Sequence, residues 1–312
     1  MTIITTLLLA TILSASQAFT LITFDVDGTL VKGSGKDADA SAHSRAFSHA
    51  VGSVLGDGNP VQPVAEALPR ELYHGSTDGL ISLRLSRATL GIEPAEAAPQ
   101  LDAIMETMYD YISKLTDEEV AQGITPLPNV IETLERLSTM KDRVMCGLVT
   151  GNVEGIARRK MRAVGMLQTG ALAKPSPEQL KRKWAGSDDI GFLGGFGSDF
   201  CSGDIDDPTR NYLDRSQQIE IAANRCRMML GDRLKRVVHV GDAPADVLAA
   251  KAYAERVDGI CVGMVATATG SYGAEELRQL AGESVPGRWE PVILEDGIAD
   301  PGFLAACGIQ EE

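Results

Sequence analysis

Two aspartates separated by one residue follow a short apolar run near the start of the chain. Residues 20–24 (TLITF) are apolar or β-branched, and Asp25, Asp27 and Gly28 come next. In an extended backbone alternate side chains point the same way, so both carboxylates can face one ligand, while Gly28 permits a sharp turn. One carboxylate can attack phosphorus, and the other can protonate the leaving oxygen and then activate water. Because carboxylates and phosphate repel one another, this chemistry requires a cation.

The alternative for these residues is a calcium-type DxDG loop or a solvated turn. The apolar strand predicted before Asp25 and the Thr-Leu pair that follows Gly28 argue against both.

A second polar turn follows the apolar run at 144–149. The Thr150 hydroxyl can donate a hydrogen bond to a phosphate oxygen, and the backbone amides of Gly151 and Asn152 precede a predicted helix, whose N-terminus favours anions. A strand followed by Thr-Gly is common, so this turn gains meaning only beside the first motif. We assign Gly28, Gly151 and Asn152 to substrate binding.

A third turn, GDAPAD, follows the apolar residues 236–240. It places Asp242 after the strand and Asp246 one turn along the next helix, where both can reach one ligand. Oxygen-only ligands suit magnesium rather than zinc or copper. The alternative for Asp242 is helix capping.

Apolar runs that alternate with helical patterns predict the elements that must position these residues. The expected strands are 20–24, 144–149, 236–240, 259–265 and 289–294, and the expected helices are 130–137, 154–164, 217–230 and 245–254. This alternation predicts an α/β fold with a doubly wound parallel sheet. Ligands of such sheets bind at the carboxyl ends of the strands, near the point where the strand order reverses. Asp25, Thr150 and Asp242 should therefore converge.

The sequence also predicts a domain organisation. Residues 38–119 carry apolar residues at helical spacing, interrupted by Pro and Gly, which predicts a helical insert. The catalytic core is then expected to comprise 19–37 and 120–312. Residues 167–206 are rich in Gly, Ser and Asp and are expected to be mostly loop. Residues 1–18 resemble a targeting segment, an apolar run that ends in small residues.

A genuine leader would place the protein in the secretory pathway or a plastid; without one it would be cytoplasmic. The segment lacks the basic residues that begin a typical signal peptide, which argues against a secretory leader. The core strand starts almost directly after the segment, which argues against plastid targeting. We expect no stable membrane association once the leader is removed, because the apolar run is too short for a span.

Charge and cysteine content restrict the partners. The net charge is −14, from 43 acidic and 29 basic residues, and such a surface repels nucleic acid and anionic lipid. The five cysteines are widely spaced without a CxxC pair, which predicts mostly buried free thiols and no zinc site. A phosphorylated substrate must overcome the negative field through a metal ion or placed Lys and Arg.

The three motifs, in this order, resemble the signatures of the haloacid-dehalogenase superfamily, and the layout looks most like phosphoglycolate-phosphatase-like hydrolases. The resemblance implies a Rossmann-like core with a helical cap inserted after the first strand. It implies that Asp25 is the nucleophile and Asp27 the general acid/base. It also implies Mg²⁺, bound by Asp25, the backbone carbonyl of Asp27, Asp242 and Asp246.

The third signature of that superfamily is a lone basic residue that steadies the nucleophile and the phosphate. Arg215 fits the family position, near the start of the helix before the GD strand. Lys174 resembles the KPxP form of other members but lies far upstream. Lys160 is a third candidate, although on the helix after Thr150 it is expected to face solvent.

Thr77 and Asp78 close an HGSTD segment in the helical insert. Either residue can cap the helix expected from Gly79. The segment also resembles a GxTD substrate loop in the cap of phosphoglycolate-phosphatase-like members, so we assign both residues to substrate binding.

The resemblance predicts a magnesium-dependent phosphatase that hydrolyses a small phosphomonoester, such as 2-phosphoglycolate, through an aspartyl phosphate. Sugar phosphates and nucleotides remain alternatives. A dehalogenase or phosphonatase would not need Asp27. A phosphosugar mutase retains both aspartates, and a non-catalytic binding protein on this fold generally loses one of the motif aspartates. Both stay open, and magnesium-dependent turnover of a chromogenic ester would exclude the binding protein.

Overall fold

A sheet of six parallel strands forms the centre of the computed structural model, which describes residues 17–33, 41–172 and 193–310. The strands are β1 (Phe19–Phe24), β4 (Val144–Thr150), β5 (Leu193–Phe196), β6 (Leu234–Gly241), β7 (Cys261–Thr267) and β8 (Trp289–Leu294). Their order is β5-β4-β1-β6-β7-β8, so the order reverses between β1 and β6. This confirms the predicted doubly wound sheet, whose ligand crevice lies at that reversal.

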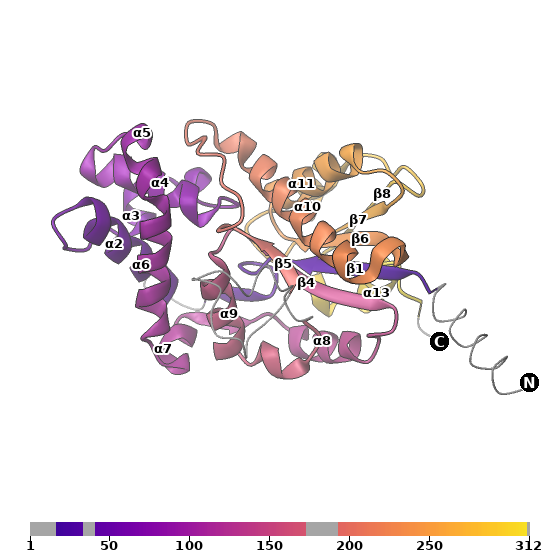
Figure 1. Cartoon of the computed structure of the whole chain (residues 1–312). Helices are drawn as coiled ribbons and strands as arrows, with labels where there is room; N and C mark the ends of the chain where they lie inside the picture. Colours follow the sequence, from indigo (N-terminus) through magenta and orange to yellow (C-terminus); the bar gives the residue numbers. More distant parts are fainter. Residues whose placement is uncertain (1–16, 34–40, 173–192, 311–312) are drawn as a thin grey trace, which may run out of the picture.

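Helices cover both faces of the sheet because successive strand residues point to opposite sides. On β1, Ile22 and Phe24 join the core beneath one helical layer, whereas Leu21 joins the core beneath the other. The first layer is α8 (Val130–Ser138), α9 (Glu154–Ala163) and α13 (Phe303–Ala306). The second layer is α10 (Asn211–Leu230), α11 (Pro244–Arg256) and α12 (Ala274–Ala281). Figure 1 shows the sheet between them.

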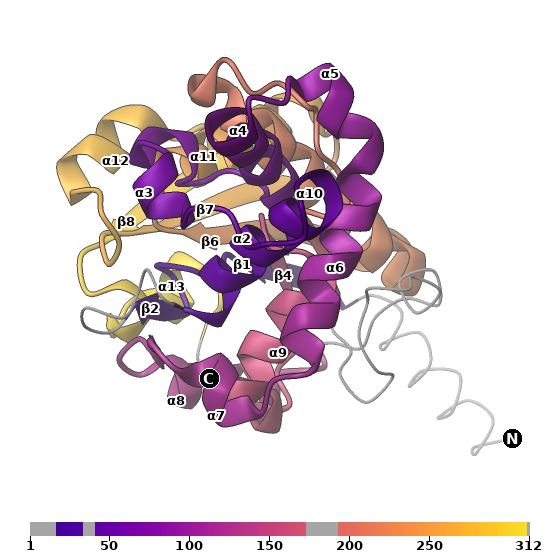
Figure 2. The same cartoon turned by 90° about the vertical axis from the view of Figure 1, so that its left-hand side faces the viewer.

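A helical insert leaves the core through two short antiparallel strands, β2 (Val31–Gly33) and β3 (Ile124–Pro126). Between them lie α2 (Ala42–Leu55), α3 (Val64–Ala67), α4 (Asp78–Leu90), α5 (Pro94–Ala97), α6 (Leu101–Ser113) and α7 (Asp117–Ala121). The insert has its own apolar core, which includes Phe47 and Met108 and continues onto Val153 and Ile156 at the start of α9. It therefore packs against the carboxyl-end side of the core (Figures 1 and 2).

Short 3₁₀ helices complete the described chain. They are η2 (Arg70–Leu72), η3 (Ala98–Gln100), η4 (Met166–Thr169), η6 (Pro208–Arg210), η7 (Gly231–Arg233) and η8 (Gly297–Ala299).

The edge strand β5 lies in a segment expected to be mostly loop. Its sequence, LGGF, carries two glycines, which weaken a strand pattern. They are required by packing, because a Cβ on Gly195 would lie 2.0 Å from the backbone oxygen of Gln218 in α10. The described remainder of the segment is mostly loop, as expected, and the sequence pattern missed this one strand because close backbone approach, rather than β propensity, selects its glycines.

Several expectations about the rest of the chain can be compared with the described residues. All five cysteines are free, and Cys146, Cys226 and Cys307 are buried, as expected. Residues 1–16 of the predicted leader and Lys174 lie outside the described residues. Within the described parts of the chain, no helix is both long and apolar enough to cross a membrane.

Candidate active site

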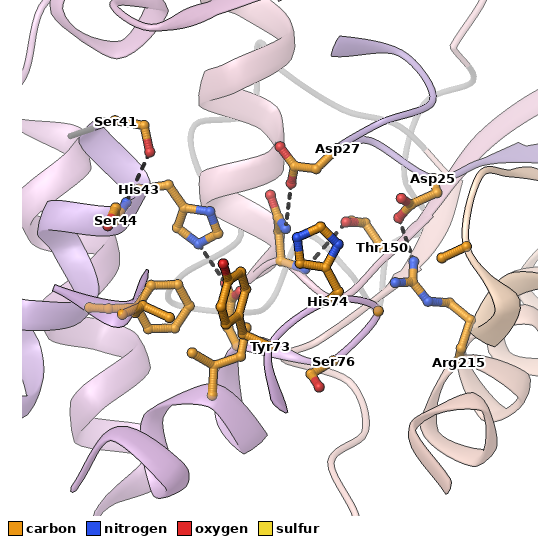
Figure 3. A pocket seen from close by; sticks show the side chains of 18 of the residues that line it. Asp25, Asp27, Ser41, His43, Ser44, Tyr73, His74, Ser76, Thr150 and Arg215 are labelled. Atoms are coloured by element: carbon orange, nitrogen blue, oxygen red, sulfur yellow. Dashed lines mark hydrogen bonds and ion pairs between the residues drawn. The ribbon is translucent and has the colours of Figure 1, made fainter. Parts of the chain in front are cut away.

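Asp25 ends the central strand and is buried among groups from three other elements. Its backbone amide donates to the Val240 carbonyl at 2.8 Å, which extends the β1–β6 pairing into the turn. Gly28 then adopts a φ of 95°, a left-handed conformation that glycine accepts without steric cost. The carboxylate of Asp25 faces Arg215 (Figure 3), whereas that of Asp27 accepts a hydrogen bond from Asn152 Nδ2 at 3.1 Å. The two acids therefore occupy different environments.

Arg215 of α10 forms a buried ion pair with Asp25. Its Nη1 lies 2.5 Å from Asp25 Oδ1 and also donates to the Val149 carbonyl at 2.9 Å, while Nε lies 3.5 Å from Asp246 Oδ1. Burial raises the pKa of Asp25 to about 6, although Arg215 opposes this rise. Burial disfavours the Arg215 cation too, but Asp25 and Asp246 outweigh it and raise the pKa of Arg215.

Three buried carboxylates converge beside this ion pair. One ligand oxygen each of Asp25, Asp242 and Asp246 lies within 4.8 Å of the others. Burial, followed by the charges of Asp25 and Asp246, raises the pKa of Asp242 well above its usual value. Arg215 is the cation in contact with this cluster. A hard divalent cation would relieve the excess negative charge, and the all-oxygen donor set fits Mg²⁺.

The turns around the cluster hold Asp242 closely in place. Thr29 Oγ1 donates to Asp242 Oδ1 at 3.0 Å. A Cβ on Gly28 would lie 2.3 Å from Asp242 Oδ2, and a Cβ on Gly270 would lie 1.7 Å from it. The two glycines therefore leave the space that this carboxylate fills. Gly270 belongs to a loop to which the sequence assigned no role.

Asp246 is held by backbone and imidazole donors. It accepts from the Ala243 amide at 3.1 Å and lies 3.2 Å from His239 Nε2. The other ring nitrogen of His239 lies 3.1 Å from Thr23 Oγ1. Burial alone would raise the pKa of Asp246, but Arg215 and His239 lower it overall. Asp246 is thus an ionised carboxylate with a fixed orientation.

The second polar turn lies beside Asp25 because β4 pairs with β1. Thr150 is buried at the end of β4 and lines the cavity described below, and its Oγ1 accepts from the Asn152 amide at 3.3 Å. The Gly151 carbonyl accepts from the Asp78 amide at 2.8 Å. A Cβ on Gly151 would lie 2.1 Å from the Ser76 oxygen, so the insert touches this turn directly.

Lys160 is not exposed to solvent, which corrects the expectation from its position on α9. Its side chain is 6% exposed, and Nζ lies 2.9 and 2.8 Å from the two carboxylate oxygens of Asp27. Nζ also donates to Asn152 Oδ1 at 2.8 Å, and Asn152 Nδ2 donates to Asp27 Oδ2 at 3.1 Å. Burial would raise the pKa of Asp27, but Lys160 and His43 lower it overall. Lys160 therefore pairs with Asp27, whereas Arg215 pairs with Asp25.

A cavity of about 260 Å³ opens between these groups and the insert. From the sheet ends it is lined by Asp25, Asp27, Thr150, Gly151, Asn152, Arg215, Asp242, Ala243 and Asp246, and from the insert by Ser41, His43, Ser44, Phe47, Val64, Ala65, Tyr73, His74, Gly75, Ser76, Asp78 and Ile81. Figure 3 shows the imidazoles of His43 and His74 between the two walls. The cavity therefore joins the acidic cluster to a space enclosed by the insert.

The HGSTD segment performs structural and lining roles at once. Thr77 caps α4, since its Oγ1 accepts from the Leu80 amide at 3.3 Å, and Thr77 is not among the lining residues. Asp78 lines the cavity, and its Oδ2 accepts from the Val153 amide at 2.7 Å and lies 3.1 Å from His43 Nε2. The capping alternative therefore holds for Thr77, and Asp78 joins the insert to the start of α9.

Sequence reasoning assigned no role to His43 or His74 and ranked Lys160 last. Each is a single residue on a helix or a turn, with no spacing that separates it from an ordinary surface residue. Lys174 lies outside the described residues, so its position beside this site is not described.

Comparisons with known proteins were made on sequence and on structure. The sequence model of a hydrolase family, described as haloacid dehalogenase-like hydrolase, matches residues 19–185, more than half of the chain. Comparison with curated protein sequences gave no significant match. A predicted phosphoglycolate phosphatase from Haemophilus somnus is 17% identical, covers 81% of this chain and 86% of its own, and has a TM-score of 0.41. CbbY from Rhodobacter sphaeroides, solved in complex with phosphate, is 17% identical, covers 94% of this chain and 100% of its own, and also has a TM-score of 0.41.

Proposed function

This chain belongs to the haloacid dehalogenase-like hydrolases, and on that premise we propose that it is a magnesium-dependent phosphatase acting on a small phosphomonoester through an aspartyl phosphate. The observation that carries the proposal is the buried Asp25–Arg215 pair, beside which one carboxylate oxygen each of Asp25, Asp242 and Asp246 lies within 4.8 Å of the others. This arrangement joins a nucleophile, a fixed cation and a metal-binding oxygen cluster at the carboxyl ends of parallel strands.

Arg215 orients the nucleophile in the first half of the reaction. It holds one oxygen of Asp25 at 2.5 Å, which leaves the other oxygen to attack phosphorus. The Asp25 Oδ–P bond forms as the P–O bond to the alcohol breaks, and Asp27 gives its proton to the departing oxygen. We expect Arg215, the Thr150 hydroxyl and the backbone amides of the same turn to donate hydrogen bonds to the phosphoryl oxygens.

Asp27 reverses its role in the second half. It takes a proton from water as that water attacks phosphorus, and the bond to Asp25 breaks to release phosphate. Lys160 and Asn152 support this role because they favour the ionised form of Asp27. A phosphate dianion that arrives nearby raises the pKa of a carboxyl group, so the substrate itself promotes the protonated form that the first half requires.

Asp25, Asp242, Asp246 and the backbone carbonyl of Asp27 are the groups that would hold Mg²⁺. The bound cation would neutralise charge between the carboxylates and the phosphate. Support for this binding comes from the three buried carboxylates within 4.8 Å of one another. Burial first, and the neighbouring carboxylates second, raise the pKa of Asp25 and of Asp242.

The cavity size supports a small substrate. Its volume of about 260 Å³ lies below the roughly 300–1,000 Å³ of pockets that enclose drug-sized ligands, which disfavours a nucleotide. The resemblance in sequence adds 2-phosphoglycolate as one candidate within that size.

Phosphate release from a panel of phosphometabolites, with magnesium and with chelator, tests the proposal. We expect magnesium-dependent release by the wild type and none by Asp25→Asn, whose amide cannot attack phosphorus. Absence of release from every compound by a folded, magnesium-supplied protein would refute it.

A further inference from the structure

Apolar side chains form part of the wall that the insert contributes to the cavity. This apolar surface comprises Phe47 of α2, Val64 and Ala65 of α3, Ile81 of α4 and the ring of Tyr73. Phe47 and Val64 belong to the apolar core of the insert, so this surface is fixed by packing. A substrate portion that contacts it gains free energy in proportion to its apolar area.

The polar groups of the same wall are neutral or already paired. Asp78 Oδ2 is shared by His43 Nε2 at 3.1 Å and the Val153 amide at 2.7 Å. Burial and then the nearby Arg70 charge lower the pKa of His74, so its imidazole is neutral near pH 7. Arg70 itself stacks over Tyr272 at 5.8 Å from the ring centroid and is not a lining residue.

Among the described residues that the insert contributes to this wall, there is no lysine or arginine. A carboxylate held against these described residues would lose hydration without gaining a lysine or arginine partner from them, which is costly. It would also lie in the same cavity as Asp25 and Asp27. Hydroxyl groups face a different situation, because Ser41 and Ser44 line this wall and can exchange hydrogen bonds with them.

We propose that the substrate is the phosphate monoester of a small uncharged alcohol with an apolar portion, and that the site discriminates against esters whose alcohol carries a carboxylate. The proposal rests on the proposed phosphatase function and narrows its substrate. This substrate class excludes 2-phosphoglycolate, because the alcohol that it releases carries a carboxylate. The phosphate binds at the sheet ends, and the alcohol lies against the apolar surface.

Two matched pairs of esters test this proposal with the full chain and magnesium. The first pair is 2-hydroxyethyl phosphate and 2-phosphoglycolate, which differ in one terminal group. The second pair is phenyl phosphate and 4-carboxyphenyl phosphate. We expect kcat/KM to be at least about tenfold higher for the uncharged member of each pair. Equal values, or higher values for the carboxylates, would overturn the proposal while leaving the phosphatase function intact.

A charge added to the wall provides a second test. Ala65 is exposed on α3 and lines the cavity, so Ala65→Lys should fold and place an ammonium at its rim. The preference for uncharged esters should fall about fivefold, the effect of one solvent-accessible ion pair. Ala95→Lys is the matched control, because Ala95 is exposed on α5 and is not a lining residue.

The outcomes separate the two proposals. An unchanged preference in Ala65→Lys, with circular dichroism like that of the wild type, would show that the charge of this wall does not determine which esters are hydrolysed. That result would overturn the inference. If the folded, magnesium-supplied protein hydrolyses none of the four esters but releases phosphate from other compounds of the panel, the inference fails and the phosphatase function stands. If it releases phosphate from no compound at all, the phosphatase function fails and the inference fails with it.

Discussion

Replacing Lys160 by methionine would test the assignment of Asp27 to acid/base chemistry. Methionine retains an unbranched side chain and a good helix propensity, so the substitution removes mainly the ammonium group. That group contacts both Asp27 oxygens, at 2.8 and 2.9 Å. It favours the ionised carboxylate, so its loss should raise the pKa of Asp27.

The size of the effect follows from the geometry of the pair. Two unit charges about 4 Å apart interact by about 4 kcal/mol at an effective dielectric constant of about 20. The Asp27 side chain is 48% exposed while that of Lys160 is 6% exposed, so solvent screening reduces this upper value toward about 1–2 kcal/mol. Since about 1.4 kcal/mol corresponds to one pKa unit, we expect a rise of about one unit.

The assay is the pH profile of kcat with 4-nitrophenyl phosphate. This leaving group needs little protonation, so breakdown of the aspartyl phosphate, in which Asp27 must be deprotonated to activate water, contributes to kcat. A raised pKa means that Asp27 deprotonates at higher pH, so the acid limb of the profile should move upward by about one unit. Lys160→Arg retains the charge and should keep the wild-type limb. Superimposable acid limbs for Lys160→Met and the wild type would refute the reasoning.

Three further changes address the metal and phosphate groups. Asp25→Asn should lower kcat more than about a thousandfold, measured by phosphate release, and activity within about tenfold of wild type would contradict the nucleophile assignment. Arg215→Ala leaves the buried Asp25 carboxylate unpaired and should lower the free energy of unfolding by about 3–5 kcal/mol. Because the nucleophile and the phosphate also lose this cation, Arg215→Ala should reduce kcat/KM far more than Lys174→Ala does; the reverse order would transfer the role to Lys174. Gly270→Ala places a Cβ 1.7 Å from Asp242 Oδ2, so a magnesium titration should show a higher half-saturating concentration, and an unchanged value would show that the loop yields.

The sheet was predictable because burial on both faces leaves a clear pattern. Strands such as 144–149 and 236–240 are near-continuous apolar runs that end in polar residues, which is typical of parallel strands between two helical layers. The same polar ends revealed Asp25, Thr150 and Asp242, because topology alone brings strand ends together. The structure places all three in one cavity.

Sequence reasoning missed those features that depend on contacts between separate segments of the chain. The glycines of β5 are explained by an oxygen of Gln218 in α10, and the burial of Lys160 is explained by Asp27 and Asn152. Neither contact leaves a local pattern in the sequence. Hydropathy periodicity indicates which face of an element is buried, but it does not indicate which group from another element contacts that face. His43 and His74 were missed for the same reason, since the insert brings them over the cavity.

The central place of β1 has a consequence for how this protein acquires its structure. β1 is the first described strand along the chain, yet its neighbours in the sheet are β4 from Val144 and β6 from Leu234. Both pairings are highly non-local, and such contacts slow folding because loop closure must precede them. During synthesis, the edges of β1 stay unpaired until much of the chain has emerged, a period of exposure to misassociation. Because Asp25 ends this strand, recovery of activity on refolding should trail recovery of helical signal.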